Sequence, residues 1–126
     1  MSNLVIVRGG GDIASGTIYK LYQCGFKVLV LETNKPSAIR RHVSFCEAVY
    51  QGTQTVEDLT CTLASTLDEA KALLEKGQLV MLVDPNGESI KACEPIAVVD
   101  AILAKKNLGT TRDMAKITIL EKIIEI

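Results

Sequence analysis

The segment 4–32 constrains the fold more than any other, because its hydrophobic period changes twice. The run LVIV at 4–7 is continuous and apolar, which is typical of a strand buried on both faces. From Ile13 the apolar residues recur at helical spacing, and a second apolar run follows at 27–32. Two adjacent strands joined by one crossover helix must be parallel. We therefore expect an α/β fold, in which a parallel sheet carries helices on both faces.

Later segments continue this alternation. Residues 66–77 place apolar side chains on one helical face, have acids in the first turn and end in Lys76 and Gly77, which predicts a helix. Buried strands are predicted within the segments 78–87 and 95–103, and a last, isoleucine-rich strand within 116–126. The length of 126 residues suits one domain with its own core. The prediction is a single Rossmann-like domain over residues 1–126, with a mostly parallel sheet.

Residues 37–65 depart from this alternation. The stretch 37–45 predicts no more than a turn of helix. The runs 46–52 and 59–65 are rich in β-favouring residues and flank the polar segment 53–58. Two arrangements are open at this point, a small β-hairpin inserted into the domain or two separate edge strands.

The charge balance and the aromatic content argue against a nucleic-acid partner. The chain has 14 basic and 15 acidic residues, and aromatic residues make up 4% of it. A protein that binds a polyanion needs a basic surface, and one that stacks bases needs aromatic rings. We expect no nucleic acid among its partners.

The apolar runs and the cysteine spacing are typical of a cytoplasmic protein. The longest apolar runs, 79–83 and 96–99, are far shorter than the roughly 20 residues of a membrane-spanning helix. The amino terminus lacks the basic start and long apolar stretch of a signal peptide. We therefore expect a cytoplasmic location and no membrane contact. The four cysteines are far apart and His42 is the single histidine, so we also expect reduced thiols and no metal site.

The loop after the first strand has the pattern GxGxxA, which is typical of dinucleotide-binding domains. In this pattern Gly9 permits a tight turn, Gly11 lets the backbone approach a pyrophosphate, and Ala14 lets the helix pack closely on the strand. The pyrophosphate sits where helix amides are free and the helix dipole is positive. The same glycines are also compatible with a tight turn that packs a helix on a sheet and holds no ligand.

An aspartate follows the glycines, where a phosphate would be expected. We expect Asp12 to cap a helix that begins at Ile13. The diphosphate would then lie along the glycine amides rather than on the helix axis, with Arg8 as a counter-charge. The candidate ligand-binding residues of this loop are Arg8, Gly9, Gly10, Gly11, Asp12 and Ala14.

Further polar residues follow the ends of the other predicted strands. A carboxylate in the position of Glu32 accepts hydrogen bonds from the hydroxyls of a ribose and repels a 2′-phosphate, which favours NAD over NADP. Asp84 is best explained as a turn or cap residue, whereas the role of Asp100 is open. Arg40 and Arg41 are more typical of a solvated surface than of a phosphate contact.

The segment 104–111 is a second candidate binding loop. Its lysines, asparagine, glycine and hydroxyls can hold an anionic group through side chains and backbone amides together. A solvated turn explains the same residues equally well. The candidate residues are Lys105, Lys106, Asn107, Gly109, Thr110 and Thr111.

Three segments together resemble an accessory family of bacterial selenium-dependent molybdenum hydroxylase systems, which is related to maturation factors of xanthine dehydrogenase. They are VRGGGDIASG, AIRRHVSFCEAVYQG and VVDAILAKKNLGTTRDMA. The glycine loop by itself equally resembles the start of NAD-dependent precorrin-2 dehydrogenases. Members of the accessory family continue through a further glycine-containing segment, so we expect this chain to be the N-terminal part of a longer family protein.

The resemblance implies an accessory or maturation factor that binds a nucleotide-containing ligand, either NAD or a molybdopterin nucleotide. Its partners would be a molybdenum hydroxylase or its maturation machinery. An NAD-dependent oxidoreductase is an alternative, although hydride transfer usually needs a positioned acid or base and no such group stands out. A nucleotide-sensing oligomerisation module is another. The isoleucine-rich last strand predicts an edge on which copies pair, and hence a homo-oligomer.

Overall fold

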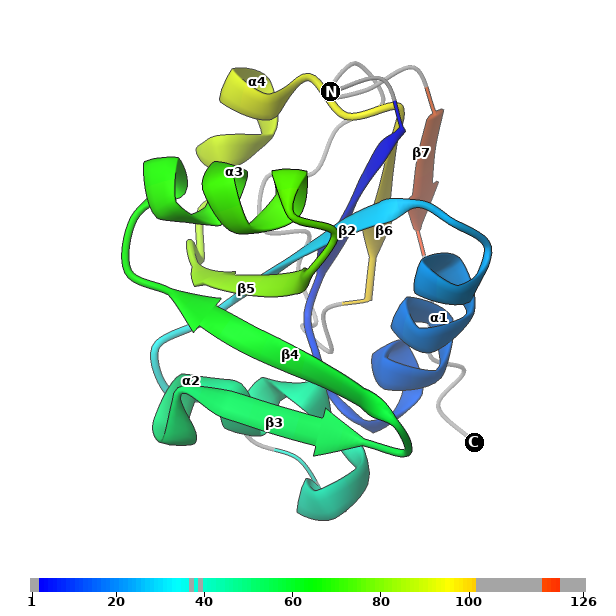
Figure 1. The fold of residues 1–126 in the computed structure, drawn as a ribbon, viewed down its shortest axis with the longest axis vertical. Coiled ribbons are helices and arrows are strands. Elements are labelled where there is room, and N and C mark those ends of the chain that lie inside the picture. The colour runs from blue at the N-terminus through cyan, green and yellow to red at the C-terminus, as the bar shows by residue number, and fades with distance from the viewer. Residues whose placement is uncertain (1–2, 37, 39, 102–116, 121–126) are drawn as a thin grey trace.

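The computed structural model of the chain describes residues 3–36, 38, 40–101 and 117–120. Within them, seven strands form one sheet in the order β3-β4-β5-β2-β1-β6-β7 (Figure 1). The strands are β1 (Leu4–Arg8), β2 (Lys27–Glu32), β3 (Thr53–Val56), β4 (Leu59–Ala64), β5 (Leu79–Val83), β6 (Ala97–Asp100) and β7 (Ile117–Leu120). The helical elements are α1 (Asp12–Gln23), η1 (Arg41–Val43), η2 (Phe45–Glu47), α2 (Ala48–Gln51), α3 (Leu67–Glu75) and α4 (Ser89–Cys93).

The order of the parallel strands is that of a Rossmann-like fold. All neighbouring pairs are parallel except β3 and β4. When the hairpin strands β3 and β4 are left aside, the remaining strands lie in the order third, second, first, fourth and fifth, as in dinucleotide-binding domains. The predicted fold class is confirmed.

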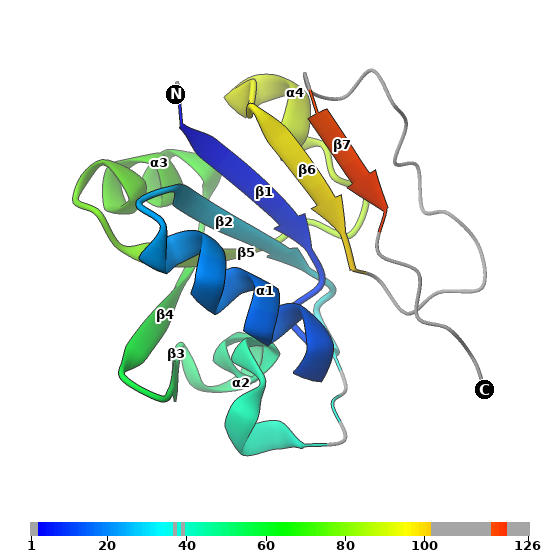
Figure 2. The ribbon, with the colours of Figure 1, turned by 90° about the vertical axis from the view of Figure 1, so that its right-hand side faces the viewer.

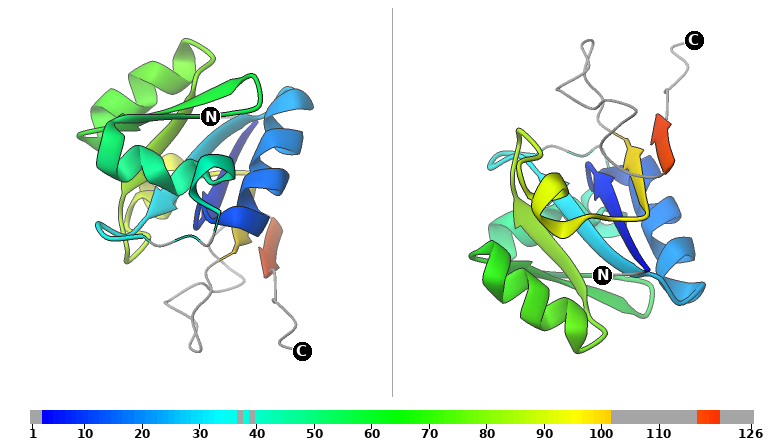
Figure 3. Two further views of the ribbon diagram at one scale, coloured as in Figure 1. Left: turned by 90° about the horizontal axis from the view of Figure 1, so that it is seen from below. Right: turned by 90° about the horizontal axis from the view of Figure 1, so that it is seen from above.

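Helices cover both faces of the sheet, as predicted. In Figure 3 the view from below has α1 and α2 in front of the sheet, and the view from above has α3 and α4 in front of it. Alternate residues of each central strand face opposite sides. On the α1 side the core contains Val5, Val7, Ile18, Val28, Val30, Phe45 and Met81, among others. On the α3 side it contains Leu4, Ile6, Leu29, Leu31, Leu74, Leu82, Ile90 and Val98, among others.

The βαβ unit expected from the first residues is present. β1 pairs in parallel with β2, with Leu4 opposite Lys27 and Arg8 opposite Leu31. Figure 2 shows α1 running alongside β1 and β2, the two strands that it connects. Its buried positions Ala14 and Ile18 are four residues apart, so they occupy the one helical face that packs on the sheet.

The prediction for residues 46–52 is wrong. They form η2 and α2 rather than a strand. Phe45 and Ala48 are fully buried in the α1-side core, three residues apart, with Val49 packed against it. Helical spacing therefore prevails over the β-favouring composition of this short run, because it brings these apolar side chains onto one face.

The first strand of the hairpin lies further along the chain than predicted, whereas the second strand, β4, lies where it was predicted. Its first strand, β3, occupies residues assigned to the loop, and Glu57 and Asp58 make the turn, with Glu57 at a φ of 56°. Because β4 also pairs in parallel with β5, the hairpin extends the main sheet instead of forming a separate unit. The short polar strand β3 is consequently an edge of the described sheet.

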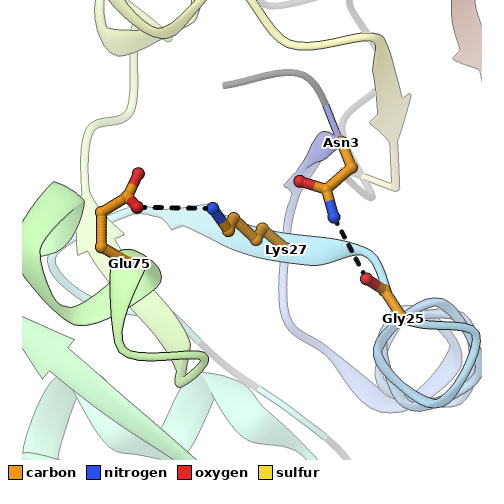
Figure 4. Close-up of polar contacts among 4 residues, drawn as sticks. All are labelled: Asn3, Gly25, Lys27 and Glu75. Atoms are coloured by element: carbon orange, nitrogen blue, oxygen red, sulfur yellow. Dashed lines mark hydrogen bonds and ion pairs between the residues drawn. The ribbon is translucent and has the colours of Figure 1, made fainter.

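At the amino ends of the strands the contacts are exposed and structural. Figure 4 shows Asn3 donating a hydrogen bond to the Gly25 carbonyl (3.2 Å), next to an ion pair of 3.6 Å between Lys27 and Glu75. An exposed ion pair of this kind contributes about 0–1 kcal/mol to stability. These contacts hold the amino-terminal ends of β1 and β2 in place. The polar residues of interest lie at the opposite edge.

The helices of the described residues are all too short or too polar to span a membrane.

The cysteines differ in exposure. Cys24 is exposed, whereas Cys46, Cys61 and Cys93 are buried free thiols. Burial raises the pKa of the Cys61 and Cys93 thiols, so little reactive thiolate is present at neutral pH.

We expect a thiol reagent such as DTNB to label Cys24 rapidly in the folded protein, and the three buried cysteines only after unfolding. Mass spectrometry of the labelled protein, with and without urea, measures the number and position of the modified thiols. Cys24→Ser should remove the rapid phase. Rapid labelling of a second thiol in the folded protein would contradict the described core.

Candidate functional site

The carboxyl ends of four neighbouring strands, β5, β2, β1 and β6, meet at one edge of the sheet. Glu32 ends β2, Arg8 ends β1, Asp100 ends β6, and Asp84 follows β5. Ligands of open α/β sheets bind outside this edge, where the strand order reverses. Here the reversal lies between β1 and β6, since the chain passes from β1 to β2 on one side and reaches β6 on the other. The sequence-based prediction that these polar residues share one edge is confirmed.

Two amides of the glycine loop donate hydrogen bonds to β2. The Gly9 amide donates to the Leu31 carbonyl (2.8 Å), and the Gly10 amide donates to Glu32 Oε2 (2.8 Å). The expectation that the amides of Gly9, Gly10 and Gly11 all face a diphosphate is therefore wrong for the first two. The reason is that β2 runs beside the loop and supplies acceptors for these amides.

Gly10 also forms the contact between the loop and the segment after β2. Its carbonyl accepts a hydrogen bond from the Cys46 amide (2.8 Å). A Cβ atom at Gly10 would lie 3.2 Å from the Cys46 nitrogen and 3.0 Å from Met81 Cε. Gly10 occupies the first x of the GxGxxA pattern, a position that the pattern leaves unspecified. The pattern therefore does not predict this close approach.

Ser15 connects the start of α1 to the segment that contains Phe45 and Cys46. The sequence analysis did not identify this residue. Its buried hydroxyl donates to the Gly11 carbonyl (2.8 Å) and accepts from the Phe45 amide (2.9 Å). A serine beside Ala14 on the core-facing side of a predicted helix was the available signal. A buried hydroxyl needs hydrogen-bond partners, and here one comes from the adjacent glycine loop and the other from the distant segment of Phe45.

Glu32 is held in place by hydrogen bonds from two backbone amides. Besides the Gly10 amide, its carboxylate accepts the Thr33 amide at Oε1 (2.9 Å). A carboxylate has about four acceptor positions, and the described residues occupy two of those of Glu32. Val83 lies opposite Glu32 in the β2–β5 register and is 37% exposed. The Glu32 carboxylate is thus held in place beside an apolar surface. This arrangement could bind a ribose through the carboxylate and a neighbouring planar base through the apolar surface.

The free amides of the loop lie at the beginning of α1. This helix begins at Asp12 with Gly11 in the N-cap position, so the prediction that Asp12 caps a helix starting at Ile13 is wrong. The first intrahelical bond runs from the Ser15 amide to the Gly11 carbonyl. The amides from Gly11 to Ala14 therefore have no partner within the helix and lie at its positive end. An anionic group fits better here than along Gly9 and Gly10.

Arg8 does not serve the glycine loop as the expected counter-charge. It follows Ile6 on the α3 side of the sheet, whereas Glu32 follows Val30 on the α1 side. Its side chain is 1% exposed, and Nη2 donates to the Pro85 carbonyl (3.1 Å). Arg8 therefore holds the turn after β5.

Asp100 is the neighbour of Arg8 in the β1–β6 register and is 9% exposed. Residues directly opposite each other in adjacent strands face the same side of the sheet. Opposite charges thus lie side by side in the buried part of the carboxyl edge. Asp100, whose role the sequence left open, therefore lies beside Arg8, on the face of the sheet opposite to that of Glu32.

Asp84 is a turn and capping residue, as predicted. Its carboxylate oxygens accept the amides of Glu88 (3.1 Å) and Ser89 (2.7 Å) at the start of α4. Gly87 completes the turn with a φ of 71°, and a Cβ there would lie 3.3 Å from Arg8 Cζ. Arg40 and Arg41 are both exposed, in agreement with the predicted surface role.

The second candidate loop is outside the described residues. This applies to Lys105, Lys106, Asn107, Gly109, Thr110 and Thr111, whose anion-binding role stays a prediction. Within the part of the chain that the structure describes, no three or more His, Cys, Asp or Glu side chains gather in a metal-binding arrangement.

Comparison with known proteins gives one informative similarity. No protein-family model and no solved structure matches the chain. The chain is similar to the Escherichia coli (strain K12) protein described as "Uncharacterized protein YqeB", with 51% identity over 116 residues. The matched region is 92% of this chain and 21% of the relative, so the chain spans about a fifth of the relative's length.

Proposed function

We propose that the chain binds a ribose-containing nucleotide at the carboxyl edge of the sheet, as part of an accessory factor for a molybdenum hydroxylase. The ligand is of the NAD or molybdopterin-nucleotide type. The single observation that carries the binding proposal is the position of Glu32, which β2 holds against the glycine loop.

Glu32 supports the ribose contact through its geometry. Its two bonds to the Gly10 and Thr33 amides fix the carboxylate before any ligand arrives. A ribose offers two neighbouring hydroxyl donors to the remaining lone pairs, and charge-assisted bonds of this kind are about twice as strong as neutral ones. Because the acceptor is already ordered, less entropy is lost on binding.

The start of α1 supports the position of the phosphates. A helix of 12 residues presents the amides of residues 11–14 at the same edge as Glu32. Phosphate groups bind at such helix ends because amide donors and the helix dipole act together. The ligand would thus run from Glu32 past Gly11 to the beginning of α1.

The link to molybdenum enzymes rests on the resemblance of the three sequence segments described above. The role proposed for the chain is to hold the nucleotide part of a cofactor while a partner enzyme is matured or loaded. Association with a molybdenum hydroxylase or its maturation machinery, and pairing of copies of the chain, belong to the same proposal.

The test compares ligands that differ only at the ribose. We expect the protein to bind NAD more tightly than NADP, and GDP more tightly than 2′-deoxy-GDP, in isothermal titration. Loss of a hydrogen bond to a charged group should cost about tenfold or more in affinity. Glu32→Gln keeps an oxygen for the Gly10 amide but removes the charge, so the preference for NAD over NADP should shrink.

Glu75→Gln is the matched control, since Glu75 is an exposed acid at the opposite edge, where it pairs with Lys27. It should leave all affinities unchanged. The proposal fails if none of these ribonucleotides binds, or if Glu32→Gln weakens NAD and NADP equally.

A further inference from the structure

The buried hydroxyl of Ser15 lies between the glycine loop and η2, and the proposed ligand contacts do not involve it. The side chain is 2% exposed. Its oxygen accepts the Phe45 amide (2.9 Å), and its hydrogen faces two carbonyls, those of Gly11 (2.8 Å) and Gly10 (3.2 Å). A hydroxyl has one hydrogen, so the two carbonyls share it. One side chain thus joins the glycine loop to a segment 30 residues away.

Only part of this arrangement is usual for a serine in a helix. The bond to the Gly11 carbonyl runs back four residues, a local pattern that serines within helices often adopt. The contacts with Gly10 and Phe45 reach beyond α1. They connect Ser15 to the residues that hold the carboxyl edge together.

Gly10 is the residue on which these contacts converge. Its carbonyl accepts the Cys46 amide (2.8 Å) and the Ser15 hydroxyl (3.2 Å), and its amide donates to Glu32 Oε2 (2.8 Å). A carbonyl oxygen has two lone pairs, and both are used here. Because a glycine has no side chain to restrict its backbone, the donors at the carbonyl limit the directions in which the amide can point. That amide holds Glu32.

We propose that Ser15 is a positioning residue of the ribose site. Its hydroxyl keeps Gly10 in the orientation in which the Gly10 amide fixes the Glu32 carboxylate. A carboxylate that is ordered before the ligand arrives loses less entropy on binding, and it stays where it repels a 2′-phosphate. This inference rests on the proposed nucleotide function and names a residue that determines its specificity.

Loss of the hydroxyl releases Glu32 through the segment that contains Phe45 and Cys46. The Phe45 amide loses its acceptor in a buried position, which is unfavourable, so the segment moves or admits water. The Cys46 amide belongs to the same segment, and its bond to the Gly10 carbonyl weakens as well. Gly10 then no longer holds the carboxylate in one place.

The experiment is isothermal titration of NAD and NADP into the wild type and Ser15→Ala. We expect the preference for NAD to shrink by about threefold to tenfold in the variant, the effect of ordering one additional side chain on binding. NAD loses affinity because the ligand must now order Glu32, whereas NADP loses less because a mobile carboxylate turns away from the 2′-phosphate. Ser15→Thr keeps the hydroxyl and should restore the wild-type preference.

Ile18→Val is the matched control for a loss of stability alone. Ile18 is fully buried on the same helix, and a smaller side chain there leaves a cavity in the core. Such a change lowers the midpoint of thermal unfolding but leaves the ratio of the two dissociation constants unchanged, since both ligands bind the same folded state.

A second measurement uses the wild type and does not depend on the folding of Ser15→Ala. Energetic coupling is reciprocal, so a ligand that uses the ordered Glu32 stabilises the contacts that order it. We expect NAD to slow hydrogen exchange at the amides of Phe45 and Cys46. The exposed Glu69 amide, which donates to Thr66 at the start of α3, is the control and should not respond.

Each outcome has a separate meaning for the two proposals. If the wild type prefers NAD and Ser15→Ala keeps the same preference, the ribose site stands and the role of Ser15 falls. Unchanged exchange at Phe45 and Cys46, an equal shift in Ile18→Val, or no recovery in Ser15→Thr also overturns that role. If neither NAD nor NADP binds the wild type, the proposed function itself fails.

Discussion

Arg8→Ala lowers the free energy of unfolding by about 3–5 kcal/mol, which is the usual cost of removing one of two buried opposite charges. Arg8 is 1% exposed, donates to the Pro85 carbonyl and lies in register with the buried Asp100. Its loss removes the positive charge opposite Asp100 and releases the turn after β5. A small domain is stable by about 5–15 kcal/mol in total, so this is a severe change.

Urea unfolding followed by circular dichroism measures the effect. A double-mutant cycle with Asp100→Ala should give a coupling of about 0.5–3 kcal/mol, because the two side chains share one face of adjacent strands. Arg41→Ala, at an exposed arginine, should remain within about 0.5 kcal/mol of the wild type. If Arg8→Ala matched that control, the charge at Arg8 would have no structural role.

The second large effect is a loss of stability that we expect at Gly10 but not at the adjacent Gly11. Gly10→Ala should destabilise the protein by about 1–3 kcal/mol, the usual cost of forcing an additional carbon into a packed site. The new Cβ would meet the Cys46 backbone at 3.2 Å and Met81 Cε at 3.0 Å, and the backbone has little freedom to move away.

Gly11→Ala is the matched control, because nothing lies within 4 Å of a Cβ at Gly11 and its φ is −72°. Alanine is a poorer N-cap than glycine but restricts the unfolded chain, so the two effects offset each other to within about 1 kcal/mol. The measurement is the midpoint and slope of urea unfolding for both variants. Equal losses at Gly10 and Gly11 would contradict the close packing of the loop on η2.

This pair of variants also shows what the GxGxxA pattern conveys. The pattern assigns the close approach to Gly11, where a ligand would lie. The structure places the close intramolecular contact at Gly10, where the chain packs on itself. A local pattern describes the turn but contains no information on the segment that later packs against it.

The parallel sheet and the shared polar edge followed from the sequence. Hydrophobic period distinguishes strands from helices over segments such as 4–32 and 66–77, and the connection between parallel strands then brings their carboxyl ends together. The presence of Glu32 and Asp100 at that edge required no tertiary information. The strand predicted for the short run 46–52 was wrong because few residues define the period of this run. The burial of Phe45 and Ala48 determined its helical form.

The individual roles at the edge depended on the tertiary structure. Which amide Glu32 accepts and which turn Arg8 holds are both set by segments distant in sequence. Such contacts depend on how the connection after β2 folds back onto the glycine loop. The sequence by itself determined the architecture and the chemical groups at its edge, because both follow from local periodicity. Only the packing of distant segments decided which of those groups bind one another and which remain available to a ligand.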